Sequence, residues 1–185
     1  MRKLLIFGDS MVRVLLNFNF QMETHISAWG GAKLDEQHRS LILHKINQCL
    51  NNTNDEYVII IHFGTNNIGA RNPKTRKSAN AFLTELHELI KELSLLPRIS
   101  VVISSILPRK FEDFKEKTIK TNLKISELCK VLPKNFSYCR SYKKFITNNK
   151  HVQEDFYCDE VHLNTRGGQF FKSILDEAIK HAQFL

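Results

Sequence analysis

The sequence lacks several features that would place it in a familiar class at once. No apolar run approaches the roughly 20 residues that a membrane-spanning helix requires. The run after Met1-Arg2-Lys3 is too short for a signal peptide. The four cysteines contain no C-x-x-C pair, which suits a reducing compartment and offers no structural zinc site. We therefore expect a cytoplasmic protein, or a domain cut from a longer chain.

Several catalytic motifs are also absent. The chain contains no Gly-x-Ser-x-Gly, no P-loop and no Gly-x-Gly-x-x-Gly, which argues against an α/β-hydrolase, an NTPase and a dinucleotide-binding enzyme. His87-Glu88 is not a zinc-peptidase motif, because Lys occupies position 91. We expect neither a metal nor a cofactor.

The composition is that of a globular protein with an excess of positive charge. The chain has 185 residues, 42% of them hydrophobic and 25% charged, which fits one domain over residues 1–185. The net charge of +8 permits attraction to nucleic acid or an anionic membrane, although solvated helix faces also explain such clusters. The basic positions that follow Asn66 are Arg71, Lys74, Arg76 and Lys77, and a second series is Lys110, Lys117 and Lys124.

Apolar runs that alternate with helical patterns predict the fold. Residues 4–7, 57–63 and 99–106 have the character of strands buried on both faces, and residues 22–27 and 136–139 add two further strands. Helices are expected over 34–49, 82–93 and 110–131, and from about residue 164 onward. This alternation predicts an α/β protein, a three-layer α/β/α sandwich of flavodoxin-like order with about five parallel strands.

Polar residues that could carry chemistry follow several of these strands. The first strand ends at Gly8, and Ser10 follows at its carboxyl end, the edge where ligands bind in open α/β sheets. Ser10 is a candidate nucleophile, and the alternative is that it caps the next segment. His162 is a candidate general base, oriented by Asp159 three residues earlier; the alternative is a loop histidine beside the last helix.

Acyl transfer also needs donors for a developing oxyanion. The backbone N–H groups of Ser10 and Gly31 and the side-chain amide of Asn66 are candidates, with Gly30 as an alternative to Gly31. The chain thus contains every part of an esterase that requires no metal.

In these motifs the chain resembles the SGNH, or GDSL-like, hydrolases. The four blocks of that family correspond to Gly8-Asp9-Ser10, Gly30-Gly31, Gly64-Thr65-Asn66, and Asp159 with His162. The resemblance implies a flavodoxin-like fold and a serine esterase, lipase or deacetylase that acts on small acyl or acetyl esters.

The chain departs from the family at Asn67, where an aspartate is usual, and we expect this change to matter little. Residues 61–68 and 161–164 are also similar to the esterase domains in the first open-reading-frame protein of some LINE-type retrotransposons. That resemblance implies a domain of a longer protein that binds nucleic acid and self-associates. In the alternative function, the domain associates with nucleic acid or lipid, and ester hydrolysis is secondary or vestigial.

Overall fold

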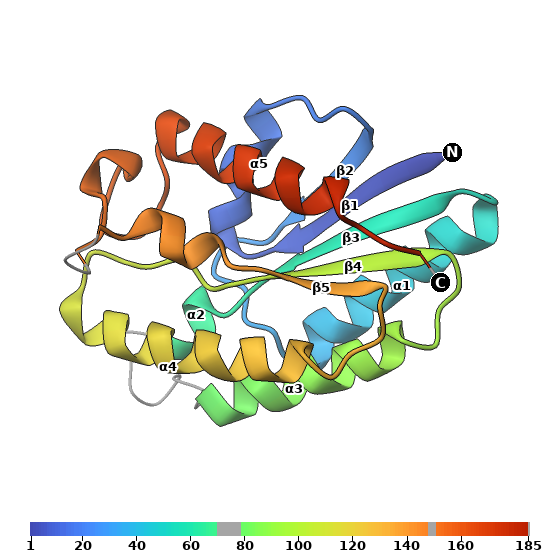
Figure 1. Cartoon of the computed structure of the whole chain (residues 1–185), viewed down its shortest axis with the longest axis horizontal. Helices are drawn as coiled ribbons and strands as arrows, with labels where there is room; N and C mark the ends of the chain where they lie inside the picture. The colour runs from blue at the N-terminus through green and yellow to red at the C-terminus, as the bar shows by residue number, and fades with distance from the viewer. Residues whose placement is uncertain (70–78, 148–150, 185) are drawn as a thin grey trace.

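The computed structural model describes residues 1–69, 79–147 and 151–184. A five-stranded sheet forms its centre, with strand order β2-β1-β3-β4-β5 and every neighbouring pair parallel (Figure 1). This is the flavodoxin-like order, and it confirms the predicted α/β fold. The strands are β1 (Arg2–Gly8), β2 (Glu23–Ala28), β3 (Glu56–His62), β4 (Ile99–Ser104) and β5 (Phe136–Cys139).

Helices cover both faces of the sheet, which gives the three predicted layers (Figure 1). On one face lie α1 (Glu36–Asn52), α3 (Ala79–Leu93) and α4 (Glu112–Cys129). On the other lie α5 (Thr165–Lys180) and the 3-10 helix η1 (Ser10–Asn17). Three short elements complete the described chain: α2 (Thr65–Ile68), η2 (Ser141–Phe145) and η3 (Glu154–Phe156).

The central strands are apolar throughout because both of their faces are buried. In β1, Leu5 and Phe7 pack against the layer of α1, α3 and α4, whereas Leu4 and Ile6 pack against η1 and α5. Successive side chains of a strand point to opposite faces, so a strand between two helical layers needs an unbroken apolar run.

The differences from the sequence prediction lie at element ends. Helix α1 continues to Asn52, three residues beyond the predicted helix over 34–49, and the segment after Ser10 is a 3-10 helix. A further short 3-10 helix, η3, lies before the predicted last helix. The predicted basic connection with Arg71, Lys74, Arg76 and Lys77 lies outside the described residues.

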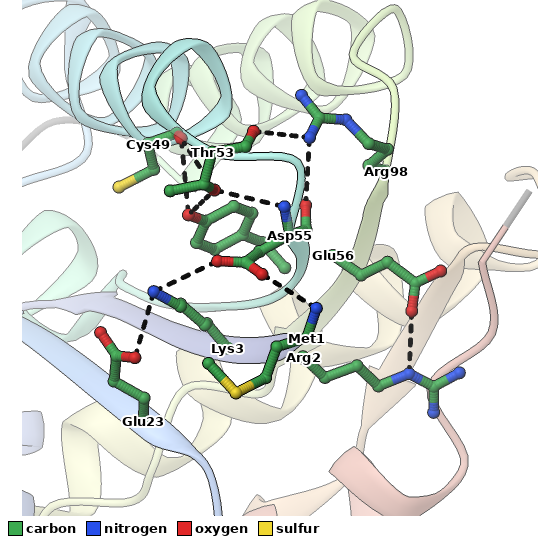
Figure 2. A network of polar contacts seen from close by, with 10 residues as sticks. Met1, Arg2, Lys3, Glu23, Cys49, Thr53, Asp55, Glu56 and Arg98 are labelled. Carbon is green, nitrogen blue, oxygen red and sulfur yellow. Dashed lines mark hydrogen bonds and ion pairs between the residues drawn. The ribbon is translucent and has the colours of Figure 1, made fainter.

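A polar network joins the strand starts, at the opposite end from Ser10 (Figure 2). The Lys3 ammonium lies 3.1 Å from a carboxylate oxygen of Glu23 and 3.2 Å from one of Asp55. Arg98 has a positive φ of 57°, and its guanidinium donates to the carbonyls of Leu50 and Thr53 at 2.8 and 2.7 Å. Arg98 thereby satisfies backbone carbonyls at the end of α1 that the helix itself leaves unpaired.

The packing of α5 on the sheet supplies a test of the fold. Phe171 is fully buried, and its ring centre lies 5.1 Å from that of His62. We expect Phe171→Ala to lower the free energy of unfolding by about 3–5 kcal/mol, through lost burial and a cavity. Leu95→Ala, at a side chain that is 80% exposed, should change it by less than about 0.5 kcal/mol. Urea unfolding measures both, and equal losses would contradict this packing.

Candidate active site

Four loops bring the predicted site residues to the carboxyl edge of the sheet. Asp9 and Ser10 follow β1, Gly30 and Gly31 follow β2, and Asn66 lies in α2, directly after β3. The segment before α5 completes the set with His162 and Asp159. Parallel strands end at one edge, so residues far apart in the sequence meet there.

The structure places Ser10, His162 and Asp159 in a line of contacts. Nε2 of His162 lies 3.1 Å from Oγ of Ser10, and Nδ1 of the same ring lies 2.7 Å from Oδ2 of Asp159. The other carboxylate oxygen of Asp159 accepts hydrogen bonds from the backbone N–H groups of Val161 and His162, both at 2.6 Å. The carboxylate is thus held in place by the backbone of the segment whose histidine it contacts.

These contacts keep Asp159 ionised. Partial burial by itself would raise the pKa of the carboxyl group. Hydrogen bonds from the His162 ring and from the backbone N–H groups of His162 and Val161 outweigh that effect and lower the pKa to about 2. A carboxylate that stays charged near neutral pH is suited to orient an imidazole and to stabilise its protonated form.

The capping alternative for Ser10 is wrong. Asp9 is the N-cap of η1, and its Oδ1 accepts a hydrogen bond from the backbone N–H of Met11 at 3.0 Å. The Ser10 hydroxyl contacts His162 instead. The two residues therefore divide the tasks, since Asp9 starts the helix and Ser10 faces the histidine.

The candidate oxyanion donors Ser10, Gly31 and Asn66 follow β1, β2 and β3, respectively. Asn66 Nδ2 donates to the carbonyl of Ala32, the residue after Gly31, at 3.1 Å. This bond uses one of the two N–H groups of the amide. Gly31 has a φ of +70°, a conformation that favours glycine. The assignment of Gly31 rather than Gly30 as the donor stays a prediction.

A buried arginine that the sequence did not indicate contacts Asn66. Arg109, which follows β4, is only 7% exposed. Its guanidinium donates to Oδ1 of Asn66 at 3.2 Å and to the carbonyls of Thr65 and Gly69 at 2.9 and 3.1 Å. Arg109 thus orients the Asn66 amide with its nitrogen toward the glycine loop. Nothing in the local sequence distinguishes this arginine from a solvated one.

Asn67 also has a role that the sequence did not indicate. Its side chain is fully buried, its Oδ1 accepts from the N–H of Leu34 at 2.9 Å, and its Nδ2 donates to the carbonyl of Leu34 at 3.0 Å. An ionised aspartate accepts hydrogen bonds but cannot donate one. The asparagine is therefore matched to both backbone groups of Leu34. The expectation that the departure from aspartate matters little stays a prediction.

Two buried titratable groups lie just beneath the site. Desolvation raises the pKa of Asp9 to about 6, against the opposing effects of the Met11 N–H, Thr65 and the positive charge of Arg109. Desolvation lowers the pKa of His62 to about 3, so its ring is neutral near pH 7, with Nδ1 3.1 Å from the Ser104 hydroxyl. His62 packs against Phe171 in the core.

An open cleft of about 640 Å³ adjoins Ser10 and His162, within the size range of small-molecule sites. The first turns of η1 and the segment 158–165 form its walls. Its lining residues are Ser10, Met11, Arg13, Val14, Leu16, Asn17, Cys158, His162, Leu163, Asn164 and Thr165. The cleft leads directly to the Ser10 hydroxyl, as a substrate-binding surface must.

The described residues contain neither a group of side chains suited to bind a metal ion nor a helix suited to span a membrane. In the described parts of the chain, no three His, Cys, Asp or Glu side chains are grouped so that they could hold a metal ion. None of the helices in those parts is both long and apolar enough to cross a membrane.

Solved structures share this fold. A putative platelet activating factor from Streptococcus pneumonia has 20% sequence identity and a TM-score of 0.75, over 95% of this chain and 83% of that one. A lipolytic protein of the G-D-S-L family from Veillonella parvula has 15% identity and a TM-score of 0.71, over 97% and 99%. Axe2, an acetylxylan esterase from Geobacillus stearothermophilus, has 12% identity and a TM-score of 0.67, over 99% and 94%.

These similarities establish that the chain has the fold of the GDSL-type, or SGNH, hydrolases. No protein-family model matches the sequence, and no curated protein does. The likeness therefore lies in the three-dimensional structure, at sequence identities of 12–20%.

The buried pair with Leu34 predicts the effect of Asn67→Asp. The aspartate loses the N–H donor and, when ionised, places an unpaired charge in the core, so we expect a loss of roughly 2–4 kcal/mol of stability near pH 7. The loss should shrink in acid, because a protonated carboxyl group donates again. Urea unfolding at pH 4.5 and 7.5 measures it, with the exposed Asn19→Asp as control. Equal losses in the two variants would contradict the assignment.

The raised pKa of Asp9 predicts a pH dependence of stability. Its pKa in the folded chain, about 6, exceeds the ordinary value of 3.8. The folded state therefore holds this proton more tightly than the unfolded state does, and the stability contributed by Asp9 falls as the pH rises from about 4 to 6. Asn cannot ionise, so the unfolding free energy of the native chain minus that of Asp9→Asn should fall over this range. A difference that stays flat or rises would contradict the shift.

Proposed function

We propose that this chain is a serine esterase of the SGNH type that hydrolyses small acyl or acetyl esters. The observation that carries the proposal is the unbroken line from the Ser10 hydroxyl through both nitrogens of His162 to Asp159, with separations of 3.1 and 2.7 Å. Support also comes from the shared fold of a G-D-S-L lipolytic protein and an acetylxylan esterase, each matched over at least 94% of both chains.

In the proposed reaction, Oγ of Ser10 attacks the ester carbonyl carbon while Nε2 of His162 takes the hydroxyl proton. Asp159 stabilises the resulting imidazolium through Nδ1. The tetrahedral intermediate collapses, the alcohol leaves with the proton from His162, and the acyl group stays on Ser10. A water molecule that His162 activates then attacks the acyl-enzyme, releases the carboxylic acid and restores the serine.

The negative charge on the tetrahedral oxygen is assigned to three donors. These are the backbone N–H groups of Ser10 and Gly31 and the free N–H of the Asn66 amide, whose orientation Arg109 maintains. Donors that are already in place need no reorganisation during the reaction. Loss of one such donor in comparable sites lowers turnover by roughly 10²–10³-fold.

A role as the nucleic-acid- or lipid-associated domain of a longer retrotransposon protein stays a prediction. It rests on the net charge of +8 and on the motif resemblance, and four of the basic residues singled out lie outside the described part of the chain. The expected cytoplasmic location and the single-domain extent over 1–185 also stay predictions.

The decisive experiment measures hydrolysis of p-nitrophenyl esters of increasing acyl length by the native chain and by Ser10→Ala. We expect the native chain to hydrolyse the acetate ester and Ser10→Ala to lose at least about 10⁴-fold in kcat, because no other group replaces the nucleophile. The profile over acyl length separates a deacetylase from a lipase.

Ser173→Ala is a matched control, since Ser173 is exposed on α5 and donates only to the backbone of Phe170. It should retain native activity. The proposal fails if Ser10→Ala is as active as the native chain, or if the folded native chain hydrolyses none of the esters.

A further inference from the structure

One cation in the cleft has no task in the proposed reaction. Arg13 lines the same cleft as Ser10 and His162. It stands three residues after Ser10 in η1, and side chains three residues apart in a 3-10 helix are eclipsed, so both project on the same side. A methyl group built on Gly30 would lie 2.9 Å from Nη2 of Arg13, which places the guanidinium against the glycine loop. Arg13 thus borders both the cleft that contains Ser10 and the glycine loop that holds one proposed oxyanion donor.

No carboxylate of the described chain neutralises this guanidinium. Three other arginines of those ranges make ion pairs: Arg2 with Glu56, Arg39 with Glu85 and Glu92, and Arg166 with Asp155. The residues that line the cleft include no aspartate or glutamate. Asp159, an acid of the segment beside the cleft, already accepts hydrogen bonds from His162 and Val161. The cleft therefore presents a positive charge that a ligand can pair with.

We propose that Arg13 forms a subsite for an anionic group of the substrate, so that the preferred esters carry a carboxylate a few bonds from the scissile carbonyl. This inference rests on the proposed esterase function. The planar guanidinium can bind a carboxylate through two parallel hydrogen bonds, which fixes orientation as well as position. At about 2 Å of rise per residue, the Cα atoms of Ser10 and Arg13 lie about 6 Å apart along the helix, so both side chains border the same part of the cleft.

The rest of the cleft fits the carbon chain of such a substrate. Val14 and the exposed Leu16 supply apolar surface along the η1 wall of the lining. Apolar side chains beside a charged group and a few other polar groups are a usual composition of a small-ligand site. In the proposed subsite, η1 thus supplies both the apolar contact along the carbon chain and the ion pair at its end.

The test compares anionic esters with neutral esters of equal length. For a charge on the acyl side, mono-p-nitrophenyl glutarate is compared with p-nitrophenyl valerate. For a charge on the alcohol side, 4-acetoxybenzoate is compared with 4-acetoxybenzamide. In at least one pair, we expect Arg13→Gln to lower the anionic-to-neutral ratio of kcat/KM by roughly tenfold, the scale of one charge-assisted hydrogen bond. The pair that responds identifies the side of the ester that carries the charge.

The ratio separates substrate recognition from support of the glycine loop. A loss of support at Gly30 would slow both members of a pair alike and leave the ratio unchanged. Arg140→Gln is the matched control, because Arg140 is exposed at the β5 side of the molecule, outside the lining of this cleft. It should leave every ratio at the native value. Ratios that Arg13→Gln leaves unchanged in both pairs overturn the inference, while native hydrolysis of the neutral esters would still support the esterase.

A binding measurement makes the inference independent of turnover. Cys158 is exposed and lines the same cleft, so its modification by N-ethylmaleimide reports on occupancy, with peptide mapping to distinguish it from the other cysteines. In Ser10→Ala, monomethyl glutarate should slow this modification more than methyl valerate does. Adding Arg13→Gln to Ser10→Ala should abolish the difference. Equal protection by the two esters in Ser10→Ala would overturn the anion subsite, even if the chain hydrolyses no ester.

Discussion

The close approach of three strand ends at Gly8 holds the candidate site together. The carbonyl of Gly8 accepts a hydrogen bond from the N–H of Trp29 after β2, at 3.0 Å, and the next N–H, of Asp9, donates to the carbonyl of His62 at the end of β3, at 3.2 Å. A Cβ atom on Gly8 would lie 2.6 Å from that same carbonyl oxygen. Only glycine fits this contact without a shift of the backbone. The segments that carry Ser10, Gly31 and Asn66 therefore all start next to this hydrogen-bonded group of strand ends.

A layer of buried polar side chains supports the site from below. Arg109 orients Asn66, Asn67 holds the backbone of Leu34, and Asp9 caps η1. Each of these groups is buried, which is costly for a polar atom unless it is hydrogen-bonded. These hydrogen bonds leave the buried side chains few alternative arrangements, so the loops above them are held in one geometry. The rigidity that catalysis requires thus comes from residues that do not face the cleft.

The charges around the cleft follow from the same arrangement. Asp159 stays ionised because backbone and ring N–H groups donate hydrogen bonds to it and lower its pKa. At Asp9, by contrast, desolvation raises the pKa. Two aspartates beside one site therefore hold opposite shifts for reasons that are local to each. Arg13 lies at the cleft wall, and its guanidinium adds a positive charge close to where a substrate would be bound.

Much of this protein was determined by the sequence itself. Strands buried on both faces need unbroken apolar runs, so β1, β3 and β4 were recognisable, and their alternation with amphipathic helices predicted the parallel sheet and its order. Glycine followed by small polar residues after β1 and β3, and Asp159 three residues before His162, marked the carboxyl edge. Only the tertiary structure showed that Asp9 caps η1 and that Arg109 supports Asn66. It alone also showed that Asn67 pairs with Leu34 and that Arg13 lines the cleft. Most of those facts depend on contacts between residues far apart in the sequence, such as Asn66 and Arg109, which are 43 positions apart. A local pattern carries no record of which distant atom a polar side chain meets.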